Sequence, residues 1–309
     1  MIGQNLREIA FINIQHLMKW VVLLLWLRIS LSSLICEFQR SHPVNSSLRL
    51  QRKSIVNELV VAWCEEDLQW LPQQAKSFHK VTLYQKCDSP LPRDILSIPH
   101  LSVISMPNIG SADGAYLRHI TTHYYNLAQY ISFTKGYVEQ GENRNEWRAC
   151  PPTYLIEGLS RTIRRLLQNS SVTVSAALKK AFYCCNDVFV SNHLGFYPTF
   201  KYKRKSYPFT RQINRTVPMH FYKGYDGTLQ DWYQELFDNK RIIRSFFKTK
   251  NACYKGYFST TRLAIQKHPL YVYQTLHAQQ RYAGEEIDHY IERTWKALLE
   301  TPHPITCEK

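Results

Sequence analysis

The sequence predicts an α/β domain in which helices flank a mainly parallel sheet, placed behind an N-terminal transmembrane signal anchor. Three observations lead to this: strand and helix patterns alternate over the first half of the chain, 44% of the 309 residues are hydrophobic, and one apolar run lies near the start. Alternation favours a parallel sheet, because every parallel connection needs a crossover segment. The composition supplies a sizeable core and excludes wholesale disorder.

Four short runs have the β-branched and aromatic composition of buried strands. They are residues 58–63 (ELVVAW), 80–85 (KVTLYQ), 101–106 (LSVISM) and 130–134 (YISFT). In parallel sheets, ligands bind at the carboxyl ends of the strands. We therefore expect a binding site in the segments that follow these runs.

Helical patterns lie between and after these strands. Residues 65–78 start with acidic side chains and predict a helix that Pro72 kinks or shortens. Residues 114–128 carry an apolar stripe at helical spacing, and Ser111 or Asp113 can cap that helix. Further helices are predicted in the second half, over residues 153–167, 174–181, 259–282 and 285–300.

The N-terminus carries the membrane prediction. Residues 20–27 (WVVLLLWL) are wholly apolar, and Arg28 is the only charge between Lys19 and Glu37. We favour an uncleaved anchor over a cleavable signal peptide, because no clean A-x-A site follows; a buried amphipathic helix of a cytosolic protein is the third interpretation. The expected layout is a cytoplasmic tail (1–18), the anchor (19–36), a stem (37–57), a lumenal domain (58–300) and a C-terminal tail (301–309).

Sequons and cysteines favour a lumenal body in the Golgi or the ER. Three N-x-S/T sequons begin at Asn45, Asn169 and Asn214. Eight cysteines are scattered without a C-x-x-C pair, which disfavours a zinc finger and suits disulfides in an oxidising compartment. Seven lie beyond the anchor, so at least one is expected to stay unpaired, and adjacent Cys184 and Cys185 are not expected to pair with each other. The chain is then a single-pass type II membrane glycoprotein.

The charge balance predicts an anionic partner. Lys and Arg total 39 against 24 Asp and Glu, a formal net charge of +15. Residues 201–223 hold seven basic residues, several aromatic ones and no acidic one. Nucleic acid is not expected as the partner of a lumenal domain, so a nucleotide sugar or an acidic glycan is the favoured anion. A solvated basic loop is the plain alternative for this segment.

Few catalytic motifs are present. Glu65, Glu66 and Asp67 follow the first strand, where carboxylates can hold a ribose, a base or a metal, or can simply cap a helix. His119 and His123 have the i, i+4 spacing of a metal pair, but no third ligand is evident and packing is the simpler interpretation. The sequence has no D-x-D pair, glycine-rich phosphate loop or G-x-S-x-G elbow, and we expect no metal site.

Three blocks of the chain resemble an uncharacterised eukaryotic family, a domain of unknown function often found beside glycosyltransferase-like sequences. The blocks are residues 60–71 (VVAWCEEDLQWL), residues 107–124 with the P-N-I-G and Y-L-R-H-I runs, and residues 258–295 with F-S-T-T-R, Glu292 and Trp295. The first is similar to the family's V-x-x-Y-N-E-D-x-x-W-L opening, with Cys64 in place of its Asn. It also looks like the opening strand of nucleotide-sugar glycosyltransferases of the A-type fold.

The resemblance implies a glycosyltransferase-A-like fold and a donor site. It implies Asp67 near the donor nucleotide, and Asn108, Gly110 and Asp113 near its sugar or phosphates. Lys135 stands where the family has Gln and would act in place of a metal beside the diphosphate. The family's N-x-G-R-E motif lacks its Arg here, which is a departure from the pattern.

The leading functional prediction is transfer of a sugar from a nucleotide donor to a glycan or protein. Basic residues would stabilise the leaving diphosphate, and a carboxylate would take the proton of the acceptor hydroxyl. Asp67, Asp113 and His119 are the candidate catalytic residues. The alternative is a degenerate, non-catalytic lumenal protein that binds a glycan or a partner, which the missing D-x-D favours.

Overall fold

A computed structural model describes the second of two compact units, residues 1–52 and 53–309, into which the chain divides. The described residues are 57–136, 150–169, 171–185, 187–189, 229–237, 251–253, 256–280, 286–301 and 305. The predicted tail, anchor and stem (1–18, 19–36 and 37–57), the basic segment 201–223 and two sequons, at Asn45 and Asn214, lie outside the described residues, apart from residue 57. None of the helices in the described part has the length and hydropathy that a bilayer crossing requires.

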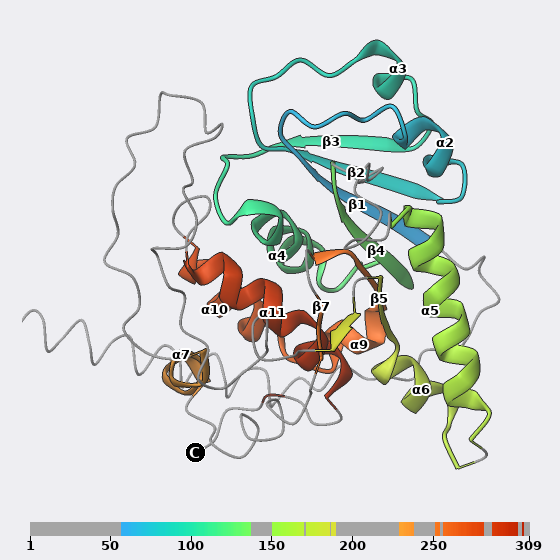
Figure 1. Cartoon of the computed structure of the whole chain (residues 1–309), viewed down its shortest axis with the longest axis vertical. Helices are drawn as coiled ribbons and strands as arrows, with labels where there is room; N and C mark the ends of the chain where they lie inside the picture. Colours follow the sequence, from blue (N-terminus) through green and yellow to red (C-terminus); the bar gives the residue numbers. More distant parts are fainter. Residues whose placement is uncertain are drawn as a thin grey trace, which may run out of the picture. The chain divides into compact units, whose positions relative to one another are not determined.

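The centre of the domain is a mixed sheet of six strands in the order β3-β2-β1-β4-β8-β5 (Figure 1). The first four strands along the chain run parallel to one another: β1 (Asn57–Trp63), β2 (Lys80–Gln85), β3 (Leu101–Ser105) and β4 (Tyr130–Lys135). The strand β8 (Phe258–Thr261) runs antiparallel to both of its neighbours, β4 and β5 (Phe182–Cys184). A separate antiparallel pair joins β6 (Asp187–Phe189) to β7 (Asn251–Cys253). The predicted α/β class and the four predicted strands are confirmed.

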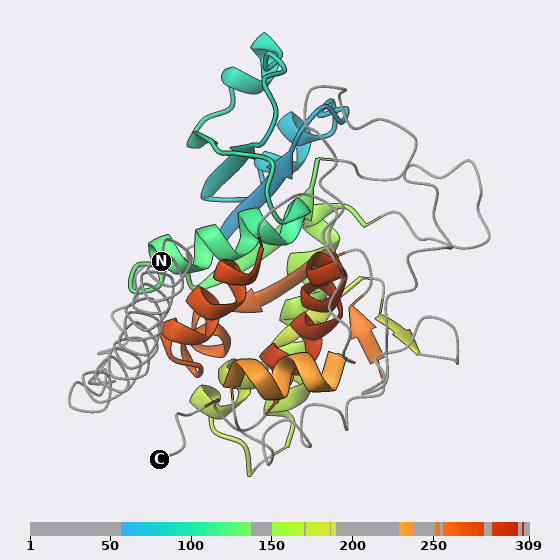
Figure 2. The ribbon, with the colours of Figure 1, turned by 90° about the vertical axis from the view of Figure 1, so that its left-hand side faces the viewer.

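Each face of the sheet is covered by its own group of helices. On one face Val60, Ala62 and Phe133 pack with α4 (Ser111–His123) and with the C-terminal helices. These are α7 (Leu229–Phe237), α10 (Leu270–Gln279) and α11 (Glu286–Glu300). Figure 2 shows α10 and α11 in red tones beside α4, and α7 in orange farther from it. The other face packs against α2 (Leu71–Ala75), α3 (Arg93–Leu96) and α5 (Pro152–Leu167). Two further helices, α6 (Val174–Lys180) and α9 (Arg262–Gln266), pack together beside the antiparallel edge.

Three helix predictions are wrong in extent. The helix predicted over residues 114–128 is α4, which begins and ends earlier, and its N-cap is Gly110 rather than Ser111 or Asp113. The helix predicted over residues 65–78 is only the five-residue α2, with Pro72 in its first turn. The helix predicted over residues 259–282 begins instead with strand β8, because its hydroxyl side chains find buried partners in the sheet. The Ser259 and Ser132 hydroxyls lie 2.6 Å apart, for example. After α9, Pro269 precedes α10 and separates the two helices.

The six described cysteines form three disulfides, Cys64–Cys87, Cys150–Cys185 and Cys184–Cys253. Adjacent Cys184 and Cys185 therefore do not pair with each other, as predicted. The expected unpaired thiol is not found among the described cysteines; Cys36 and Cys307 lie outside the described residues. The disulfides connect β1 to β2, the start of α5 to the end of β5, and β5 to β7, so they tie segments distant in the sequence to the sheet.

Candidate functional site

Two lysines stand at the carboxyl edge of the parallel strands. Lys135 is the last residue of β4, and its register partner is Ala62. Lys86 follows β2 two residues after Tyr84, which is also in register with Ala62. Because side chains alternate along a strand, both lysines face the side of the sheet that α4 covers. Two cations thus converge where parallel sheets bind their ligands.

Two carboxylates meet these lysines from helices. Asp113 lies in the first turn of α4, is 4% exposed, and accepts a 2.6 Å hydrogen bond at Oδ1 from the indole nitrogen of Trp295. Glu292 projects from α11, and its Oε1 lies 3.6 Å from Nζ of Lys135. We call Lys86, Asp113, Lys135 and Glu292 the carboxyl-edge cluster. Its members come from the ends of two strands and from two helices that contact each other.

The two carboxyl groups of the cluster have opposite pKa shifts. Burial, followed by the charge of Glu292, raises the pKa of Asp113, against the opposing effects of Lys135 and the Trp295 hydrogen bond. Burial alone would also raise the pKa of Glu292, but Lys135 and neighbouring His289 and Arg293 outweigh it and lower that pKa. At neutral pH Glu292 is therefore the anion that pairs with Lys135, while Asp113 is poised to exchange a proton.

Lys86 is a buried amine that holds the turn before α4. It is 6% exposed, and its Nζ donates a 3.1 Å hydrogen bond to the carbonyl of Ile109. Burial lowers the pKa of Lys86 to about 8, although the charges of Asp288, Asp113 and Glu66 favour its protonated form. The amine therefore stays largely charged at neutral pH, in a place where water is scarce.

The turn that Lys86 holds is tightly packed around Gly110. This residue precedes α4 with a φ of 68°, in the left-handed region that favours glycine. A Cβ at this position would lie 2.3 Å from the side chain of Gln280, whose amide donates a 3.1 Å hydrogen bond to the carbonyl of Gly110. The same amide donates to Asp288 of α11, which also accepts from the Ser111 hydroxyl at 2.9 Å. Gly110 thus fixes the start of α4 against α11.

Tyr116 and Gly256 lie beside Asp113. The Tyr116 hydroxyl is buried and has no hydrogen-bond partner among the described residues. Burial, and next the charge of Asp113, raise its pKa well above the usual value. A Cβ at Gly256 would lie 3.6 Å from the Tyr116 ring, 3.7 Å from Asp113 Oδ1 and 4.0 Å from Lys135 Cε. A buried donor without a partner at a charged cluster is a feature of ligand-binding sites.

The structure separates the residues that the sequence singled out. Asp113 and Lys135 come together in the carboxyl-edge cluster, and Gly110 leads into α4 beside it. Asp67 is exposed in the loop after β1, where its Oδ1 accepts a 2.9 Å hydrogen bond from the backbone of Gln69. Asn108 is exposed too, with its Nδ2 3.9 Å from the sulfur of Cys87.

His119, the third candidate catalyst, belongs to another cluster at the amino edge of the same strands. Glu58 of β1 lies at the centre of this amino-edge cluster. Its Oε2 is 3.6 Å from Nε2 of His119, and its Oε1 binds Lys80 at 2.8 Å and the Thr82 hydroxyl at 2.7 Å. The other ring nitrogen of His119 is 3.2 Å from the hydroxyl of Tyr84.

Sequence reasoning missed the roles of Lys86, Glu292 and Trp295. The position of Lys86 directly after β2 is a usable signal, since that is a carboxyl end of the sheet. Glu292 and Trp295 stood out only within a block that resembles a family, and nothing in their spacing connects them to Asp113, about 180 positions away. Among the described residues, no group of three or more His, Cys, Asp or Glu is placed to hold a metal ion.

Comparison with protein-family models, with curated proteins and with solved structures gives no match for this chain.

Proposed function

We propose that this domain is a nucleotide-sugar glycosyltransferase whose site is the carboxyl-edge cluster. One observation carries the proposal: two lysines and two carboxyl groups with opposed pKa shifts meet at the carboxyl edge of parallel strands. The donor would be a nucleoside diphosphate sugar, and the acceptor a hydroxyl of a glycan or protein. The resemblance of three sequence blocks to a family found beside glycosyltransferases supports the same activity.

The lysines supply the positive charge that a leaving diphosphate needs. The side chain of Lys135 is 30% exposed, so it can reach a ligand directly. Lys86 is buried next to it in the fold and adds charge in a region of low dielectric, where an ammonium acts more strongly than in water. A bound diphosphate would compete with Glu292 for Lys135.

Asp113 is the residue we assign as general base. Its raised pKa brings the carboxyl group closer to neutral pH, where a base transfers protons most effectively. Trp295 fixes one carboxylate oxygen, which leaves Oδ2 to receive the proton of the acceptor hydroxyl. The acceptor oxygen then bonds to the anomeric carbon, the bond from that carbon to the diphosphate breaks, and the diphosphate leaves with the electron pair.

The setting of the enzyme is part of the proposal. Residues 19–36 would anchor the chain as a single-pass type II membrane protein, and the body would lie in the Golgi or ER lumen. Three disulfides in the described part support an oxidising compartment. Asn169 is an exposed sequon residue in the turn after α5, which is compatible with a lumenal glycoprotein.

A second candidate function is non-catalytic binding of a glycan or partner protein. It is favoured by the burial of Lys86 and Asp113, and by the fact that Lys135 already pairs with Glu292. Groups that satisfy one another's charges can stabilise a fold without catalysis.

Binding and turnover with nucleotide sugars separate the two functions. The full-length chain in detergent would be screened by thermal shift against UDP-sugars, with and without Mn²⁺, and free UDP release would then be measured. A ligand at 100 times its Kd adds about 2.7 kcal/mol, a shift of roughly 5–10 °C for a domain of this size. Transferase activity requires a shift and UDP release that Lys135→Met weakens. The matched control is Lys76→Met, at the exposed lysine that follows α2 on the opposite face of the sheet. A folded chain that binds a glycan but no donor would support the second function.

A further inference from the structure

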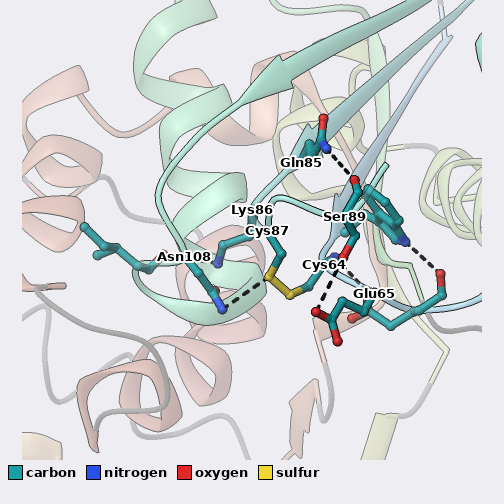
Figure 3. The surroundings of a disulfide bond; sticks show 10 residues. Cys64, Glu65, Gln85, Lys86, Cys87, Ser89 and Asn108 are labelled. Carbon is teal, nitrogen blue, oxygen red and sulfur yellow. Dashed lines mark hydrogen bonds between the residues drawn. A yellow bond between two sulfur atoms is a disulfide. The ribbon is translucent and has the colours of Figure 1, made fainter. Parts of the chain in front are cut away.

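The Cys64–Cys87 disulfide lies directly beside the carboxyl-edge cluster. Cys64 is the first residue after β1, and Cys87 follows Lys86 after β2, so the bond joins the carboxyl ends of two neighbouring parallel strands. Figure 3 shows the disulfide with Lys86 next to it in the chain and with the Asn108 side chain directed at the sulfur of Cys87. Three segments that border the cluster therefore meet at this bond.

Hydrogen bonds carry the constraint from the disulfide into the cluster. The backbone N–H of Cys64 donates a 2.7 Å hydrogen bond to the carboxylate of Glu66, whose charge acts on Lys86. On the other strand, Cys87 fixes the backbone next to Lys86, whose amine holds the carbonyl of Ile109. Releasing the disulfide frees both loops at the point where they turn away from the sheet.

The three described disulfides differ in their access to solvent. Both Cys64 and Cys87 are partly exposed. In contrast, Cys184 and Cys253 are 7% and 0% exposed. In the third disulfide Cys150 is 3% exposed and only Cys185 is partly exposed. Because thiol–disulfide exchange needs direct attack on a sulfur atom, a soluble dithiol should reach Cys64–Cys87, whose two cysteines are both partly exposed, most readily.

We propose that the Cys64–Cys87 disulfide is the positioning element of the carboxyl-edge cluster, and that a dithiol switches the site off by reducing it. In this step one dithiol becomes a cyclic disulfide and supplies two electrons and two protons, which leave Cys64 and Cys87 as thiols. The Lys86 amine then no longer donates its hydrogen bond to the carbonyl of Ile109 in the turn before α4. That reduction abolishes diphosphate binding rests on the proposed function. That reduction exposes the Lys86 amine to solvent does not depend on that function.

The test follows the amine of Lys86, which needs no ligand. The full-length protein is treated with increasing dithiothreitol, and thiol alkylation with mass spectrometry shows which disulfide has opened. Competitive amine labelling over a pH series then gives the midpoint for each lysine. Lys267 is the internal reference, because its amine donates to backbone carbonyls of residues 299 and 301, far from this disulfide in the sequence, and burial lowers its pKa to about 7.

We expect Cys64–Cys87 to open first. The Lys86 midpoint should then rise from about 8 toward the ordinary lysine value of about 10.4, while the Lys267 midpoint stays in place. A Cys64→Ser/Cys87→Ser variant should show the same shift without reductant. The matched control, Cys184→Ser/Cys253→Ser, should keep Lys86 at its original midpoint. If that control does not fold, the dithiothreitol titration of the unaltered protein still shows whether opening Cys64–Cys87 moves the Lys86 midpoint.

Two outcomes overturn the inference. One is a Lys86 midpoint that stays near 8 after Cys64–Cys87 has opened, and the other is a shift of Lys86 and Lys267 together, which reports general unfolding. UDP binding is measured on the same samples and should weaken at least tenfold with the disulfide open. If the oxidised protein binds no UDP, the transferase proposal fails. The labelling of Lys86 still tests, independently of UDP, whether the disulfide positions this lysine.

Discussion

Charged side chains have opposite energetic roles at the two edges of the parallel sheet. At the amino edge, Lys80, Thr82 and His119 gather around Glu58, and their combined attraction outweighs burial and lowers the pKa of Glu58 to about 2. At the carboxyl edge, burial dominates for two of the groups: it raises the pKa of Asp113 and lowers that of Lys86, whereas Glu292 is kept ionised by Lys135 and its other neighbours. The same helix, α4, supplies a residue to each edge, Asp113 in its first turn and His119 later in the helix.

This difference distinguishes a stabilising cluster from a candidate functional site. Around Glu58 the charged form is the favoured one, so folding and ionisation support each other. Around Asp113 and Lys86 the charged forms are disfavoured by burial, and the Tyr116 hydroxyl lies nearby without a partner among the described residues. Proteins keep such unfavourable arrangements chiefly where they bind or react.

The largest expected effect is the loss of turnover in Asp113→Asn. Removal of a general base costs 10²–10⁴-fold in rate, while the amide can still accept the Trp295 hydrogen bond, so UDP affinity should change only a few-fold. UDP release and calorimetric binding on the full-length chain measure the two quantities. Unchanged turnover would remove Asp113 from the mechanism.

The same variant tests the sign of the pKa shift. Because the native pKa of Asp113 is raised, the stability that its neutral carboxyl group contributes is complete below the unfolded pKa of about 3.9 and is lost as pH rises through the native pKa. The amide does not ionise, so Asp113→Asn should be at least as stable as the parent at pH 8. Urea unfolding at pH 5 and pH 8 would show this, and a variant less stable at pH 8 would contradict it.

Glu58→Gln should cost stability rather than activity. The lowering of the Glu58 pKa from 4.5 to about 2 corresponds to about 3 kcal/mol, present above the unfolded pKa and lost as pH falls from about 4.5 to about 2. Urea unfolding at pH 7 should therefore show a loss of about 3 kcal/mol, and the acid limb of the stability curve should flatten. A matched fall in UDP affinity of the folded variant would mean that the two edges are coupled.

Lys86→Met should weaken UDP binding by about 10–100-fold, the value of a charge-assisted contact. Its effect on stability at pH 7 should be small, because losing the cost of burying an ammonium offsets the unpaired carbonyl of Ile109. The native pKa of Lys86 is lowered, so the parent gains stability as pH rises from about 8 to 10.5, and the variant should lack this gain. Calorimetry measures the UDP affinity, and urea unfolding over a pH series measures the stability. Unchanged UDP affinity would leave Lys135 as the sole lysine of the proposed site.

The sequence was sufficient for the parallel half of the fold and insufficient for the site. The strands over residues 58–63, 80–85 and 130–134 could be read because parallel strands are buried on both faces and therefore have continuous β-branched and aromatic composition. Strand β8 could not, since Phe258–Thr261 owes its conformation to partners on β4 and β5 that are remote in the sequence.

The same limit applies to the charged residues. The resemblance to a known family singled out Asp113 and Lys135 as site residues, whereas Glu292 becomes relevant only once α11 packs on α4. His119 was assigned to the same site as Asp113, although the direction of α4 carries it toward Glu58. Which edge of the sheet a residue of α4 reaches depends on how the helix packs across the strands, and a local sequence pattern does not contain that information.

The smallest expected effect is that of Asp67→Asn, and it is the sharpest control for Asp113→Asn. Asp67 is exposed, and its only interaction found in the described part is a 2.9 Å hydrogen bond from the backbone of Gln69, which an asparagine oxygen can also accept. Stability should change by less than about 0.5 kcal/mol, and turnover and UDP affinity by less than twofold. The measurements are those used for Asp113→Asn. A large loss of UDP affinity in Asp67→Asn would mean that the donor nucleotide reaches the loop after β1, and the site would then extend from the carboxyl-edge cluster across the Cys64–Cys87 disulfide.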